Sequence, residues 1–294
     1  MKLYNKMKVL IIGTAHHKNK EALESMLKHL NWEYHYGNES DIENFNIIYL
    51  PDQPINTLKY SPEKKFIMGP HFSVFPNNKL CQIQNIHKNS IYIQPSDWAT
   101  EVWMNSGAEK YIPVKTHPFA VNTIKFAPIS NNTINKDKVF IYFKRRKPQE
   151  LKLIEHFLKG KGIEYVIFDY VKRYKENDYL NFLQHCKYGI ILGAHESQGF
   201  AIEEALSCDV PLLVWNTRYM SQEEGVKYPN IPCSTIPYWD DRCGEYFYHT
   251  SEFESKFNDF INKLYTYQPR EFVLENLSVK RCAENFKDMI NRFY

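Results

Sequence analysis

Short apolar runs alternate with helical patterns along almost all of this chain, and that alternation restricts the folds it can adopt. Residues 20–30 carry apolar side chains at helical spacing, and residues 97–106 form a second helical stretch with Asp97 as its expected N-cap. Strand, helix and strand in this order are typical of a parallel sheet with crossover helices. The apolar runs that predict strands in this half are residues 8–12, 47–50, 65–68, 91–94 and 111–114.

The same pattern restarts after residues 128–138, a polar stretch without periodicity that predicts a linker. The sequence therefore predicts an α/β chain of two Rossmann-like domains, residues 1–127 and 139–275, whose parallel sheets face an interdomain cleft. Residues 276–294 form a C-terminal helix that can return to the first domain. The second half has predicted strands at 139–143, 164–168, 188–192 and 211–214 and predicted helices at 148–159, 177–184, 199–207, 253–265 and 278–294.

Charge and hydropathy argue against several classes of protein. The 294 residues have a formal net charge of +3, too small for a dedicated nucleic-acid or membrane-surface binder. No apolar run approaches the ~20 residues of a membrane span, and the run at residues 9–12 is too short for a signal peptide. The six cysteines contain no C-x-x-C pair, so we expect reduced thiols in a cytoplasmic protein.

The most informative stretch, residues 190–215, reads IILGAHESQGFAIEEALSCDVPLLVW. A strand runs into a loop that contains Glu196, and the loop opens a helix that contains Glu204. Free N–H groups at the start of such a helix form a ready site for an anion or a hydroxyl group. Glu203 is expected to lie on the solvated face of the helix.

This stretch resembles the retaining GT-B glycosyltransferases, especially the family 4 group. Their signature is two glutamates separated by seven residues, E-G-F-G-L-x-x-x-E, followed by A-x-x-x-G-x-P-V. Glu196 and Glu204 have that separation here, and Ala205 and Pro211 follow in the family's order. Ser197, Ala201 and Asp209 depart from the family by standing where it usually has glycine.

Two further segments support the resemblance. Residues 118–128, PFAVNTIKFAP, are similar to the family's interdomain segment N-G-V-D-x-x-x-F-x-P, with Asn122 in place of the aspartate. The basic run 143–148, FKRRKP, follows the first strand of the second domain, where family members hold the donor diphosphate. Lys144 and Arg146 lie two positions apart and share a face if the chain is extended.

The first domain would supply the acceptor side. The family has a glycine-bearing loop after the first strand, and here Gly13 is followed by Thr14, Ala15 and His16. Family 4 enzymes often place a histidine from this half over the donor sugar, for which His71 is the first choice and His16 the second. His195, beside Glu196, could orient the loop, contact the sugar or cap the helix.

The resemblance implies transfer of a sugar from a nucleotide diphosphate sugar to a glycan or other hydroxyl acceptor, with retention of configuration. Glu196 would contact the donor sugar and Glu204 the ribose, while Lys144 and Arg146 stabilise the diphosphate. No metal and no other cofactor are expected, and neither is a nucleic-acid partner. A nucleotide-sugar epimerase of the same fold and a non-catalytic nucleotide-sugar or glycan-binding module are the alternatives. The remaining donor-binding residues would be Ser197, Gln198, Gly199 and Phe200.

Overall fold

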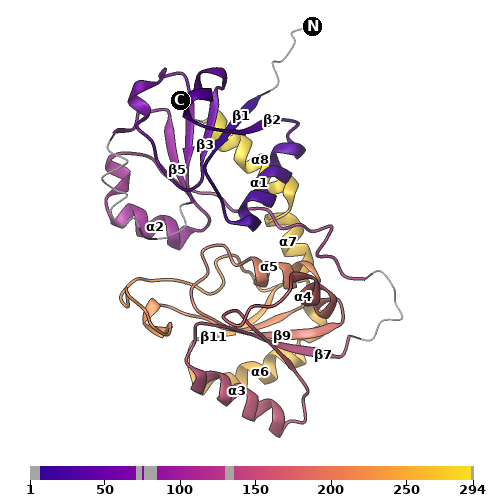
Figure 1. Cartoon of the computed structure of the whole chain (residues 1–294). Helices are drawn as coiled ribbons and strands as arrows, with labels where there is room; N and C mark the ends of the chain where they lie inside the picture. Colours follow the sequence, from indigo (N-terminus) through magenta and orange to yellow (C-terminus); the bar gives the residue numbers. More distant parts are fainter. Residues whose placement is uncertain (1–6, 71–74, 76–84, 130–135, 293–294) are drawn as a thin grey trace. The chain divides into compact units, whose positions relative to one another are not determined.

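A computed structural model describes residues 7–292 except 71–74, 76–84 and 130–135 (Figure 1). The chain divides into two compact units. Unit 1 comprises Met1–Ala120 and Leu277–Tyr294, and unit 2 comprises Val121–Asn276, so the division lies inside the proline-bounded segment 118–128. Each unit has one sheet in which every strand pair is parallel, which confirms the predicted α/β class. In the described part of the chain, no helix has the length and apolarity to cross a bilayer.

The sheet of unit 1 has the strand order β2-β1-β3-β4-β5-β6. Its central strands read as continuous apolar runs because helices cover both of their faces. Helix α1 buries Leu23, Met26 and Leu27, and it lies beside α8 (Figure 1). The elements are β1 (Lys8–Ile12), α1 (His17–His29), β2 (Glu33–Gly37), β3 (Ile47–Leu50), β4 (Lys65–Met68), β5 (Ser90–Gln94), α2 (Asp97–Asn105), β6 (Val114–Thr116) and α8 (Val279–Asn291).

The sheet of unit 2 has the strand order β11-β10-β9-β7-β8. Phenylalanine, leucine and isoleucine side chains of α3, α6 and the sheet form its main core. The elements are β7 (Lys138–Lys144), α3 (Pro148–Gly160), β8 (Val166–Asp169), α4 (Glu176–Leu183), β9 (Cys186–Gly193), α5 (Phe200–Ser207), β10 (Leu212–Trp215), β11 (Gly244–Phe247), α6 (Phe253–Asn262) and α7 (Pro269–Asn276).

Several elements differ from the sequence prediction. The predicted strand at 111–114 is wrong, because a 3-10 turn at Ala108–Lys110 delays the strand to Val114–Thr116. Ser96 is the N-cap of α2, and the Asp97 carboxylate instead accepts a hydrogen bond from Thr116. Strands β2 and β11 and helix α7 were not predicted. Both strands lie at sheet edges, where polar side chains reach solvent and no apolar run is needed.

In each sheet, the second strand lies on one side of the first strand and the third strand lies on the other side. In unit 2, β8 lies on one side of β7 and β9 on the other. In unit 1, β2 and β3 flank β1 in the same way. Open parallel sheets bind ligands outside the carboxyl ends of the strands at such a switch point. The topology therefore directs attention to the residues that follow β7 and β9, and to those that follow β1 and β3.

Candidate functional site

An ion pair occupies the switch point of unit 2. Lys144 is the last residue of β7 and lies opposite Gly193, the last residue of β9. Its Nζ donates to Oε2 of Glu196 at 2.8 Å, and the two side chains are only 15% and 10% exposed. The same ammonium lies 4.6 Å from the centre of the Tyr170 ring, at the end of β8. The structure thus brings two of the predicted site residues into contact.

Arg146 has a different environment from its neighbour. Its side chain is 0% exposed, and its Nε and Nη2 donate to both carboxylate oxygens of Glu150 at 2.8 and 2.9 Å. Nη1 donates to the carbonyl oxygens of Gly193 and Trp215, which end β9 and β10. Because no part of the side chain reaches the surface, we propose a structural role for Arg146, and its predicted contact with the diphosphate stays a prediction.

The loop between β9 and α5 is held in place by the segment that follows β10. The Glu196 amide donates to the carbonyl of Ser234 at 2.9 Å. Gly199 ends the loop with a φ of 95°, a left-handed conformation that favours glycine, and it caps α5. Ser197 and Phe200 are partly exposed, whereas Gln198 is buried. The N-terminus of α5, with its positive partial charge, therefore has a fixed position beside Glu196.

Glu203 is the clearest error of the sequence prediction. It is 2% exposed rather than solvated, and its Oε1 accepts a hydrogen bond from Gln198 at 2.8 Å. Its Oε2 has no hydrogen-bond partner among the residues that the structure describes. Burial raises the pKa of Glu203 well above its usual value, and nearby Glu204 and Glu196 raise it further against the opposing effect of Gln198. Burial therefore favours the protonated form of Glu203 over the carboxylate.

This protonation predicts an unusual pH dependence of stability. Above about pH 4.5 an unfolded glutamate has released the proton that the folded chain still holds. The free energy of unfolding therefore falls as the pH rises through this range, by up to about 1.4 kcal/mol per pH unit. We expect Glu203→Gln to match the wild type near pH 4 and to exceed its stability at pH 8, measured by urea unfolding. A wild-type profile in this variant would contradict the assignment, and Glu164→Gln, at an exposed position, is the control.

Glu204 is also buried, at 5% exposure. Burial raises the pKa of the Tyr174 hydroxyl, and the charges of Glu204 and Glu196 contribute to the increase. Glu196 and Glu204, the two glutamates of the family spacing, therefore both lie close enough to Tyr174 to raise the pKa of its hydroxyl.

A second charged group beside the loop was not predicted. His195 Nδ1 lies 2.5 Å from Oε2 of Glu223, and Arg145 Nη1 donates to the other oxygen at 3.4 Å. Burial acts to raise the pKa of Glu223, but His195 and Arg145 outweigh it and hold the pKa below its usual value. The partners are 28 residues apart and belong to no spacing motif, so only the folded chain reveals the contact.

The switch point of unit 1 contains the predicted glycine loop. Gly13 has a φ of 99°, and a Cβ there would collide with the Asp52 carboxylate, which accepts a hydrogen bond from Thr14. His16 is the N-cap residue of α1, and the centre of its ring lies 4.3 Å from that of the His17 ring, with the two rings tilted by 42°. His71 lies outside the described residues. The structure thus gives His16 a capping position and leaves its predicted catalytic role a prediction.

Metal-ligand clusters are absent from the described ranges, since no three His, Cys, Asp or Glu side chains gather there. Asp240 is followed by a second aspartate, Asp241. The Asp240 carboxylate forms an ion pair with Arg242 Nη2 at 2.8 Å. Hydrogen bonds from the Arg242 side chain hold the pKa of Asp240 below its usual value, against a raising effect of burial.

No family model matches the chain, and no curated protein is significantly similar to it in sequence. Solved structures are similar over its full length. A sucrose-phosphate synthase from Thermosynechococcus elongatus is 10% identical, with a TM-score of 0.60 over 98% of this chain and 99% of that one. An α-glucosyltransferase solved with UDP and a 13-mer DNA containing an HMU base is 13% identical, with a TM-score of 0.64 over 98% of this chain and 100% of the other.

The N-terminal domain of Candida albicans trehalose-6-phosphate phosphatase is similar as well. It is 13% identical to this chain, with a TM-score of 0.66 over 100% of this chain and 98% of that domain. At such identities the likeness establishes the fold alone. The two parallel sheets of this chain match those of the glycosyltransferases, and the predicted GT-B fold is confirmed.

Proposed function

We propose that the chain is a retaining glycosyltransferase that moves a sugar from a nucleotide diphosphate sugar to a hydroxyl group of a glycan or other acceptor. The observation that carries this proposal is the Lys144–Glu196 pair at the switch point of unit 2, beside the N-terminus of α5. The similar α-glucosyltransferase was solved with UDP, which supports a nucleotide diphosphate sugar as the donor. The fold by itself is compatible with other chemistry, so the argument depends on the site.

The pair supplies both charges that the reaction requires. As the bond from the sugar to the diphosphate breaks, negative charge grows on the phosphate and positive charge on the sugar. The Lys144 ammonium and the α5 N-terminus would stabilise the phosphate, and the Glu196 carboxylate would accept hydrogen bonds from the sugar and stabilise its charge. In the absence of donor the two side chains neutralise each other, which lowers the cost of burying them.

Glu204 is assigned to the nucleotide. It lies one to two turns into α5, and helical side chains lean toward the N-terminus, so its carboxylate would accept hydrogen bonds from ribose hydroxyls there. Side-chain and helix charges then do the work that Mg²⁺ does in other transferases, and we propose that turnover requires no metal. Activity that EDTA abolishes and Mn²⁺ restores would contradict this part of the proposal.

The nucleotide is identified by thermal shift with UDP, GDP, ADP, CMP and dTDP. A ligand at 100 times its Kd should raise the free energy of unfolding by about 2.7 kcal/mol. Product analysis with the matching nucleotide sugars then distinguishes transfer from epimerisation and from binding without turnover. Binding of none of these nucleotides would contradict the proposed function.

Lys144→Ala should weaken nucleoside diphosphate binding by roughly 1.5–3 kcal/mol, the usual value of a hydrogen bond to a charged group. Binding of the corresponding nucleoside should change much less, because it carries no phosphate. Calorimetry with both ligands measures the difference and separates it from any general damage to the fold. Lys187→Ala, at an exposed position near the opposite end of the sheet, is the matched control. Equal losses for the two ligands would disprove the diphosphate contact.

A further inference from the structure

Two buried side chains form a hydrogen bond across the start of helix α5. Gln198 lies one position before the N-cap residue Gly199, and Glu203 is the fourth residue of the helix. Gln198 Nε2 donates to Glu203 Oε1 at 2.8 Å, and the two residues are 5% and 2% exposed. An apolar pair at these two positions often fixes the angle at which a chain enters a helix. Here a polar pair, Gln198 and Glu203, takes those positions, and we call it the polar staple.

The hydrogen bond gives this staple a property that an apolar pair lacks. Contact between apolar side chains has no preferred direction, whereas a hydrogen bond restricts both the distance and the angle between its two groups. Burial of an amide beside a carboxyl group is costly, and one hydrogen bond offsets only part of that cost. The polar staple is therefore a poorer way to stabilise α5 than an apolar pair, but a stricter way to hold the loop before it.

The polar staple adjoins the carboxylate that is proposed to contact the donor sugar. A Cβ placed on Gly199 would lie 3.6 Å from the Cβ of Glu196. Glu203 lies close enough to Glu196 and Glu204 for their charges to raise its pKa. The Glu196 side chain is only 10% exposed and pairs with Lys144 at 2.8 Å. A change in the angle at which the loop enters α5 therefore moves the Glu196 carboxylate relative to Lys144.

The start of the same loop is anchored separately. The Ala194 amide donates to the Lys144 carbonyl, and the Glu196 amide donates to the Ser234 carbonyl, each at 2.9 Å. Only Ser197 stands between Glu196 and Gln198 in the chain. The backbone bonds thus fix the position of the loop at its start, and the polar staple fixes the way in which it leaves Glu196.

We propose that Glu203 is a positioning residue, which acts through Gln198 to hold the Glu196 carboxylate where positive charge develops on the donor sugar. This inference rests on the proposed transferase function. A displacement of ~1 Å at a contact to the transition state can lower the rate by about 100-fold, so the orientation of Glu196 matters for kcat. If the polar staple served only to stabilise α5, replacing it with an apolar pair of the same size would leave kcat unchanged.

The double variant Gln198→Met/Glu203→Met makes that replacement, because methionine is close in volume to both side chains. Removing both polar partners leaves neither one buried alone, so its melting temperature should not fall below that of the wild type. Its kcat should fall by roughly 10- to 100-fold, with a smaller change in KM for the donor. Glu203→Gln keeps an acceptor oxygen for Gln198 and should keep kcat within about twofold of the wild type.

A second comparison shows whether the polar staple acts through Glu196. In the Glu196→Gln background, the double methionine change should lower kcat by less than about threefold, because the contact on which it acts is already weakened. If the double variant does not fold, Glu203→Met alone makes the same comparisons with Glu203→Gln and with the Glu196→Gln background.

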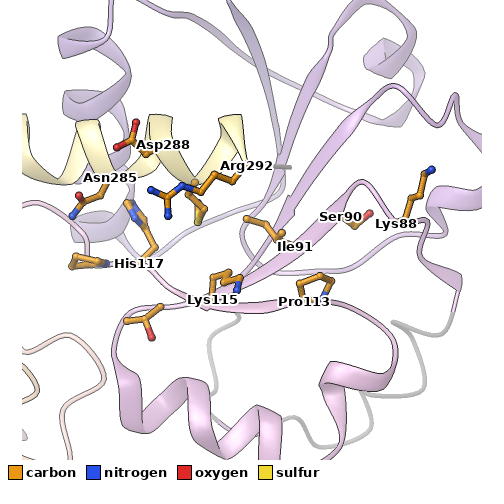
Figure 2. A pocket seen from close by; sticks show the side chains of 12 residues that line it. Lys88, Ser90, Ile91, Pro113, Lys115, His117, Asn285, Asp288 and Arg292 are labelled. Carbon is orange, nitrogen blue, oxygen red and sulfur yellow. The ribbon is translucent and has the colours of Figure 1, made fainter. Parts of the chain in front are cut away.

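The control for these measurements lies in unit 1. A cavity of about 590 Å³ there has walls from β5, β6 and α8, and none of the residues that line it belongs to unit 2 (Figure 2). Lys115 lines this cavity at an exposed position. Lys115→Ala changes a charge outside unit 2 and should keep the wild-type kcat.

Hydrogen–deuterium exchange tests the polar staple apart from turnover. The exchange rate of the Glu196 amide reports how firmly the loop is held, since this amide donates to Ser234. The double methionine variant should exchange there about tenfold faster than the wild type, and Glu203→Gln should not.

The outcomes separate this inference from the proposed function. Wild-type kcat or wild-type exchange in the double methionine variant would overturn the positioning role of Glu203, as would an undiminished loss of kcat in the Glu196→Gln background. Each of these results leaves the transferase proposal intact, because the wild type still turns over. Faster exchange in a chain whose wild type transfers no sugar would instead refute the transferase function, and the polar staple would then have a structural role only.

Discussion

Arg146→Ala is expected to lower the free energy of unfolding by about 3–5 kcal/mol, the usual cost of breaking a buried ion pair by removing one partner. The substitution leaves the Glu150 carboxylate without its bidentate donor. It also removes the guanidinium hydrogen bonds to the carbonyls of Gly193 and Trp215. It also opens a cavity against the Trp215 ring, over which the guanidinium lies at 4.9 Å.

Urea unfolding measures this loss. Lys152→Ala, at an exposed position of α3, should change the free energy of unfolding by less than about 0.5 kcal/mol. If Arg146→Ala is as stable as that control and instead loses diphosphate affinity, the guanidinium contacts the ligand as the sequence predicted, and the structural role is refuted.

Glu196→Gln is expected to lower kcat by about 100-fold, the loss seen when one electrostatic contact to the transition state is removed. The contact strengthens as positive charge develops on the sugar, so it acts more on kcat than on binding of the donor. Glu204→Gln should instead raise KM with little change in kcat, because the ribose does not change charge during the reaction.

Steady-state kinetics with the donor identified by the nucleotide screen separates these two effects. Glu164→Gln, at an exposed position of unit 2, should keep wild-type constants. Wild-type kcat and KM in both Glu196→Gln and Glu204→Gln would remove the site assignment and most of the argument for a transferase.

The sequence predicts most of the buried strands because their apolar runs are continuous. Residues 47–50 and 65–68 are β3 and β4 at the predicted bounds. It does not predict β2 and β11, since an edge strand such as Glu33–Gly37 exposes polar side chains. Local spacing also indicates the Glu196 loop and the basic run that contains Lys144, and these two residues are in contact in the structure.

What the sequence cannot supply is the surroundings of each charge. Lys144 and Arg146 look alike in the sequence, yet one side chain lies at the switch point and the other is enclosed between three elements. Glu203 and Glu204 are adjacent and both buried, although only the second fits the family spacing. The partner of His195 comes from a loop with no recognisable pattern, so no local analysis could identify Glu223.

The two-segment composition of unit 1 has a consequence for synthesis on the ribosome. Helix α8 supplies Phe286 and Ile290 to the core of unit 1, and Lys65 of β4 donates to the Ile290 carbonyl. Although the strands of unit 1 are synthesised first, helix α8, which covers part of their apolar surface, is synthesised only after all of unit 2. Unit 2 is continuous and can complete its core first, reversing the usual N-terminal-first order of domain folding. During that interval the nascent chain must keep an unfinished sheet from associating with other chains.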